Sequence, residues 1–71
     1  MTASEWLAAY AEKLGIPAPT VEDVDAVLAL AGVAAHASER IAAPVACWLT
    51  AQAGAPLGEA MALAREVSGD A

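Results

Sequence analysis

The sequence predicts an all-α fold, a compact bundle of four short helices that forms a single domain over residues 1–71. Apolar residues recur at three- and four-residue intervals in four segments, and stretches rich in proline or glycine separate these segments. No segment alternates apolar and polar residues over the length of a strand. At 71 residues the chain is long enough for only one hydrophobic core.

The first helix is predicted over residues 3–14. Thr2 and Glu5 have the spacing of a capping box, in which each side chain accepts a hydrogen bond from the backbone of the other residue. Gly15 is a typical stop signal. The apolar stripe of this helix consists of Leu7, Tyr10 and Leu14.

The segment GIPAPT, residues 15–20, predicts a stiff loop. Pro17 and Pro19 lack the amide proton that a helix needs, and each favours extended geometry in the residue before it. The second helix therefore begins after this segment, with Thr20 as its cap, and we expect it to run to about Glu39. Its inward positions are Val24, Val27, Leu28, Ala31, Ala34 and Ala35.

Two shorter helices follow. Pro44 fits the first turn of the third helix, where its missing amide proton has no helical partner to lose, and Gly54 closes this helix. The stripe of the third helix is Val45, Trp48, Leu49 and Gln52. The inward side of the fourth helix is Leu57, Ala60, Met61, Ala64 and Val67.

Alanine at many helical positions predicts that the helix backbones approach closely. Large side chains are then expected to fill the spaces between the helices: Trp6, Tyr10, Leu28, Trp48 and Leu49. We place Trp6 and Trp48 in this core. The alternative for Trp6 is an interface anchor, because tryptophan dominates many binding hot spots.

The charge balance argues against two classes of partner. The net charge is −6, and the three basic residues lie far apart in the sequence, at Lys13, Arg40 and Arg65. Nucleic acid and anionic membrane surfaces are poor partners for such a chain, because both attract clustered lysine and arginine. No run of about 20 apolar residues is present, and the N-terminus lacks a secretory pattern, so we expect a cytoplasmic protein. Its small size favours a protein partner or a homo-oligomer.

His36, Glu39 and Arg40 form the most concentrated polar cluster in the sequence. If the second helix runs to Glu39, a spacing of three and four residues places these side chains on one face. Arg40, assisted by His36, could then contact an anion or a carboxylate of a partner. The alternative is a structural role, in which the cationic groups complement the negative end of the helix dipole.

No catalytic residues, metal site or cofactor are expected, so the protein is not predicted to be an enzyme. Cys47 lies among apolar residues and resembles a small buried hydrophobe more than a nucleophile served by His36 and Glu39. A first helical turn favours carboxylates. This explains the acidic group Glu22, Asp23 and Asp25 without a metal.

The segments VDAVLALAGVAAH and AHASERIAAPVACWLTAQAG resemble a small bacterial family of helical domains of uncharacterised function. Members of that family occur as free short proteins or joined to the C-terminal side of molybdenum cofactor guanylyltransferase, the enzyme that makes molybdopterin guanine dinucleotide. The sequence departs from the family pattern at Ile41, where proline is frequent. The matching positions are Ala35, His36, Arg40, Ala42, Ala43, Pro44, Val45, Trp48, Leu49, Ala53 and Gly54.

The resemblance implies a role in molybdenum cofactor biosynthesis but no activity for this domain. Our leading hypothesis is a non-catalytic accessory or protein-interaction module whose partner is that guanylyltransferase or a second copy of the chain, with the His36 and Arg40 rim as its contact. The alternative is a small anion-binding or enzymatic protein with a pocket formed by His36, Glu39, Arg40 and Trp48.

Overall fold

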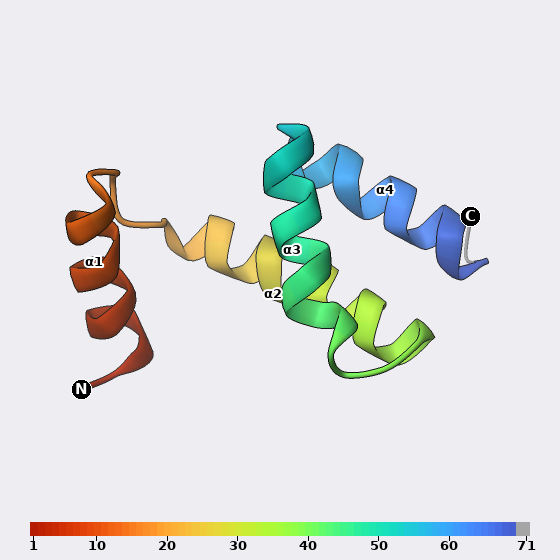
Figure 1. The fold of residues 1–71 in the computed structure, drawn as a ribbon, viewed down its shortest axis with the longest axis horizontal. Helices are drawn as coiled ribbons and strands as arrows, with labels where there is room; N and C mark the ends of the chain where they lie inside the picture. The colour runs from red at the N-terminus through yellow and green to blue at the C-terminus, as the bar shows by residue number, and fades with distance from the viewer. Residues whose placement is uncertain (70–71) are drawn as a thin grey trace.

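The computed structural model describes residues 1–69 and confirms the all-α prediction. Four helices follow one another: α1 (Ala3–Leu14), α2 (Val21–Ala37), α3 (Ala42–Ala53) and α4 (Leu57–Ser68). Residues 1–69 contain no strand. α2 is the longest helix and lies at the centre of the arrangement (Figure 1). α3 crosses α2, and α4 lies beside the C-terminal half of α2.

The predicted helix starts are set by local hydrogen bonds. At the start of α1, the Thr2 backbone amide donates to the Glu5 carboxylate at 2.8 Å, and the Glu5 backbone amide donates to the Thr2 hydroxyl at 3.1 Å. Together these bonds form the predicted capping box. At the start of α2, the Asp23 backbone amide donates to the Thr20 hydroxyl at 3.1 Å. Both starts therefore lie where the cap residues place them.

Glycines end α1 and α3 in the same way. Gly15 and Gly54 have φ angles of 77° and 66°, in the left-handed region that favours glycine. In each case the two residues after the helix donate backbone hydrogen bonds to carbonyls of its last turn, which satisfies acceptors that the helix leaves unpaired. The predicted ends of these two helices are confirmed.

The end of α2 was predicted wrongly. The helix ends at Ala37, two residues before Glu39, because Ser38 leaves the helical region with φ −141° and ψ −101°. The Ser38 hydroxyl donates to the Ala34 carbonyl oxygen at 2.7 Å and satisfies one acceptor of the last turn. A short loop, residues 38–41, then leads into α3, and Pro44 lies in the first turn of α3 as predicted.

The packing of the domain is centred on α2, which is in extensive contact with α3 and α4. Leu30 of α2 and Ala60 of α4 are buried between the helices. Leu30 was not among the predicted inward positions, which followed a neighbouring stripe of the same helix. α1 lies at the far end of the molecule, next to the beginning of α2 and away from α3 and α4 (Figure 1).

The expectation that the large side chains fill the core was wrong. Trp6 is 52% exposed and Trp48 is 60% exposed. The reason is that the buried helix contacts are made mainly by small side chains, which let the backbones approach and leave little room between them. At least half of the surface of the other expected core residues is also exposed: Tyr10, Leu28 and Leu49.

Candidate interaction surfaces

The predicted polar cluster is divided by the end of α2. His36 lies in the last turn of the helix, whereas Glu39 and Arg40 lie in the loop that follows. The helical spacing of three and four residues therefore does not place them on one face. All three residues are exposed, and none of their side chains takes part in the side-chain hydrogen bonds found among residues 1–69.

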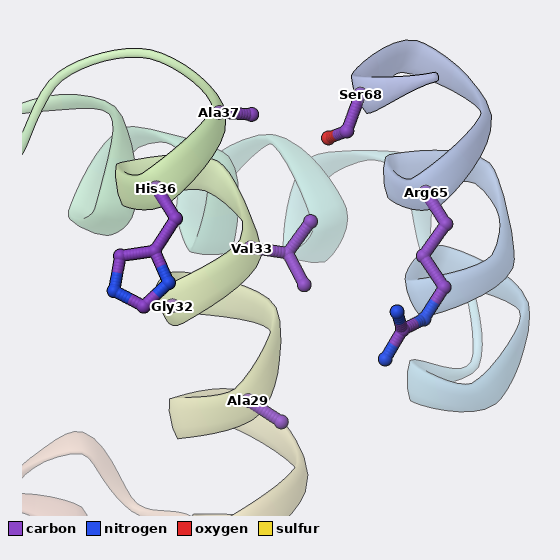
Figure 2. Close-up of a pocket in the computed structure, with 7 residues that line it drawn as sticks. All are labelled: Ala29, Gly32, Val33, His36, Ala37, Arg65 and Ser68. Carbon is purple, nitrogen blue, oxygen red and sulfur yellow. The ribbon is translucent and has the colours of Figure 1, made fainter. Parts of the chain in front are cut away.

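His36 instead borders a shallow hollow between α2 and α4 (Figure 2). Arg65 of α4 lines the same hollow, and its guanidinium group points toward α2, whereas the imidazole ring of His36 is turned away from it. Ser68 lies at the end of the hollow, and its hydroxyl donates to the Ala64 carbonyl oxygen at 2.8 Å. The polar groups around this hollow do not converge on a common point.

The other residues considered for chemistry lie elsewhere. Glu39 lines a second hollow together with Ile41 and Val45, so His36 and Glu39 border different depressions of the surface. Cys47 is a free, half-buried thiol in α3, more exposed than the buried hydrophobe that the sequence suggested. Within residues 1–69 no three histidine, cysteine, aspartate or glutamate side chains are grouped closely enough to hold a metal ion. Neither hollow brings together the four residues of the alternative anion-binding pocket, which were His36, Glu39, Arg40 and Trp48.

Charges play a local role at the start of α1. The Thr2 backbone amide donates to the Glu5 carboxylate, and this bond, with a smaller contribution from the Thr2 side chain, holds the pKa of Glu5 below its ordinary value because it favours the ionised form. Glu5 is exposed, so this effect belongs to the helix cap. In the part of the chain that the structure describes, no helix combines the length and the apolarity needed to cross a membrane.

One apolar surface runs along the outer side of α3. Ile41, Val45 and Trp48 have the spacing of residues on one helix face, and more than half of each side chain is exposed. We call these three residues the α3 stripe. Glu39 and Arg40 precede it in the loop, and Glu39 shares a hollow with two of its members. The arrangement is an apolar surface with charged groups at one end.

A second apolar surface is a groove between α2, α3 and α4, with a volume of about 570 Å³. Each helix contributes small or aliphatic side chains. Its lining includes Leu30 and Val33 of α2, Ala46 and Leu49 of α3, and Ala60 and Leu63 of α4. We call this surface the groove. The signal for it in the sequence was the second apolar row of α2, with Leu30 and Val33, because α2 is apolar around much of its circumference.

Comparison with known proteins identifies the family of this chain. The chain matches the family described as a domain of unknown function, DUF6457, over residues 1–70. No curated protein and no solved structure matches the chain.

Proposed function

The chain belongs to the DUF6457 family, and from this premise we propose that it is a non-catalytic protein-interaction module that assists molybdenum cofactor biosynthesis. The observation that carries the interaction role is the α3 stripe. Three large apolar side chains are exposed along α3 and at the residue that precedes it, and one of them is a tryptophan. Tryptophan is among the residues most enriched at the centre of protein interfaces.

The residues next to the α3 stripe fit the edge of such an interface. Protein interfaces combine an apolar centre with a polar, solvent-accessible rim. Glu39 and Arg40 lie in the loop that leads into the stripe, and both are exposed. In this role Arg40 would pair with a carboxylate of the partner.

The link to the molybdenum cofactor is supported by the resemblance of residues 35–54 to domains joined to molybdenum cofactor guanylyltransferase. This segment contains both Arg40 and Trp48, so the same residues carry the resemblance and form the proposed contact. The guanylyltransferase is therefore the partner we propose. The module would hold or orient the enzyme without contributing a reacting group.

The test is a calorimetric titration of the purified chain with a molybdenum cofactor guanylyltransferase from the same organism. We expect saturable binding, and we expect Trp48→Ala to weaken it by about thirtyfold, which corresponds to a hot-spot loss of about 2 kcal/mol. Leu28→Ala is the control, because Leu28 is similarly exposed but lies on α2, outside the α3 stripe and the groove, and it should leave the affinity unchanged. Arg40→Gln should have a smaller effect that shrinks as salt is added.

Absence of saturable binding would refute the choice of partner. Equal losses for Trp48→Ala and Leu28→Ala would refute the choice of surface. Because both side chains are more than half exposed, circular dichroism should show that both variants keep their helices.

A further inference from the structure

We propose that two copies of this chain form a dimer in which α1 of each copy packs into the groove of the other. The proposal concerns a different surface from the α3 stripe. The occupant of the groove is a helix of a second copy. The dimer also gives α1, which lies apart from α3 and α4 of its own chain, a surface to pack against. Four observations support it.

The first observation is the area that the chain leaves exposed. A compact monomer of 7.1 kDa is expected to expose roughly 4,100 Å², whereas this chain exposes 5367 Å². The excess is roughly 1,300 Å² for each copy, or about 2,600 Å² for a pair. Obligate homodimer interfaces bury about 2,000 Å² or more in total, so covering the excess would be enough for a stable dimer.

The second observation is that α1 packs little against the rest of its own chain. A helix of 12 residues is marginally stable in water without packing, and Ala11 is its only buried residue. Its apolar face is nevertheless well developed, and the rings of Trp6 and Tyr10 lie together on it with centroids 5.0 Å apart. Trp6, Tyr10 and Leu14 are each at least half exposed. Such a helix is expected to pack against an apolar surface.

The third observation is the complementarity of the two surfaces. The groove presents Ala46 and Ala60 in its walls, with Leu49 and Leu63 more than half exposed. Small side chains let another helix approach closely, and the large rings of α1 would fill the space that alanine leaves. A helix in this position would complete a bundle of four helices around Leu30.

The fourth observation concerns the connection between α1 and α2. Pro17 and Pro19 favour extended geometry in the residues before them, and residues 17–20 have no helical or turn structure. The connection therefore directs α1 away from the groove of its own chain (Figure 1). Exchange of an identical element between copies is a known low-cost route to dimers.

Charge gives this dimer a recognisable dependence on salt. Each copy carries a net charge of −6, so two copies repel one another at low ionic strength. The proposed contact is apolar. Added salt should therefore strengthen the dimer, in contrast to the Arg40 contact proposed above, which salt should weaken.

The first arm of the test measures association by analytical ultracentrifugation. We expect the wild-type chain to sediment at twice 7.1 kDa and Leu63→Glu to raise the dimer dissociation constant at least about tenfold. Leu28→Glu is the matched control, because Leu28 is an exposed leucine outside the groove and should leave the constant unchanged. Trp48→Ala should also leave the dimer intact, so the two proposals can fail separately. A wild-type chain that stays monomeric at millimolar concentration would overturn this one.

The second arm identifies the occupant in the wild-type chain and does not depend on how a variant folds. Isotope-labelled and unlabelled copies are mixed, and filtered nuclear Overhauser spectra detect contacts between copies only. Tyr10 is the single tyrosine of the chain, so its ring signals are unambiguous. Contacts between the Tyr10 ring of one copy and the Leu63 methyl groups of the other would support the proposal. Contacts between copies that do not join α1 to the groove, or no contacts between copies, would overturn it.

Discussion

Two leucines in the middle of α2 offer a direct test of which face of this helix holds the domain together. Leu30 is 3% exposed, whereas Leu28, two positions earlier, is 64% exposed. Full burial of a leucine side chain is worth about 1.5–3 kcal/mol. Burial of Leu30 therefore contributes nearly all of this free energy, whereas Leu28, with about a third of its surface buried, contributes about a third of it. We therefore expect Leu30→Ala to lower the free energy of unfolding by about 2–3 kcal/mol and Leu28→Ala by about 0.5–1 kcal/mol.

The value for Leu30 lies toward the lower end of the range for core leucines for a structural reason. Leu30 lines the groove, so in a single copy its truncation widens an existing opening and creates no closed cavity. The assay is urea unfolding followed by far-ultraviolet circular dichroism, at one protein concentration for all variants. The two substitutions are chemically identical and lie in one helix, so helix propensity cancels. Equal losses, or a larger loss for Leu28→Ala, would refute the assignment of the core.

Four further predictions concern the helix ends and one interior glycine. Gly32→Ala should raise the free energy of unfolding by about 0.5–1 kcal/mol, because Gly32 lies within α2 and a methyl group there meets no atom within 4 Å. Gly54→Ala should instead cost about 1 kcal/mol, because its φ of 66° is unfavourable for alanine; equal effects of the two changes in the same unfolding assay would contradict this. Thr20→Ala should cost about 1 kcal/mol through loss of the α2 cap, and an unchanged midpoint would rule out that hydrogen bond in solution. The lowered pKa of Glu5 means that its contribution to α1 is complete above the ordinary carboxyl pKa and is lost as pH falls through the lowered one. Helicity measured by circular dichroism should therefore fall on acidification in the wild-type chain, and the part of the fall due to α1 should be absent in Glu5→Gln.

The features that the sequence predicted well are those decided by neighbouring residues. Thr2, Glu5 and Thr20 act within three residues of themselves, and the glycines at positions 15 and 54 end helices through their own backbone. The proline-containing segment separates α1 from α2 as expected. All-α architecture and the four helices follow from these local signals together with the apolar spacing.

The burial pattern could not be predicted because it depends on which stripe of α2 meets the other helices. α2 is apolar on several sides, so the stripe with Leu28 and the stripe with Leu30 look equally suited to a core. The expectation that Trp6 lies inside assumed that α1 packs against the other helices of its own chain. In the structure it does not, and Trp6 is exposed.

The candidate polar site depended on one helix boundary. Had α2 continued to Glu39, His36 and Arg40 would have shared a face, but Ser38 ends the helix and places Arg40 in the loop. A serine hydroxyl that bonds back to the carbonyl four residues earlier is compatible with a continuing helix as well as with its end. The sequence therefore did not indicate which of the two would occur. Arg40 remains a candidate contact through its position beside the α3 stripe.

In the arrangement that we propose, α2, α3 and α4 form a core by themselves, whereas α1 is stabilised by packing into the groove of a second copy. Backbone hydrogen exchange, measured residue by residue at increasing protein concentration, tests this most directly. We predict that protection of the α1 amides rises with concentration, while the amides around Leu30 are protected at the lowest concentration at which the domain is folded. Protection of α1 that is the same at every concentration would contradict the account.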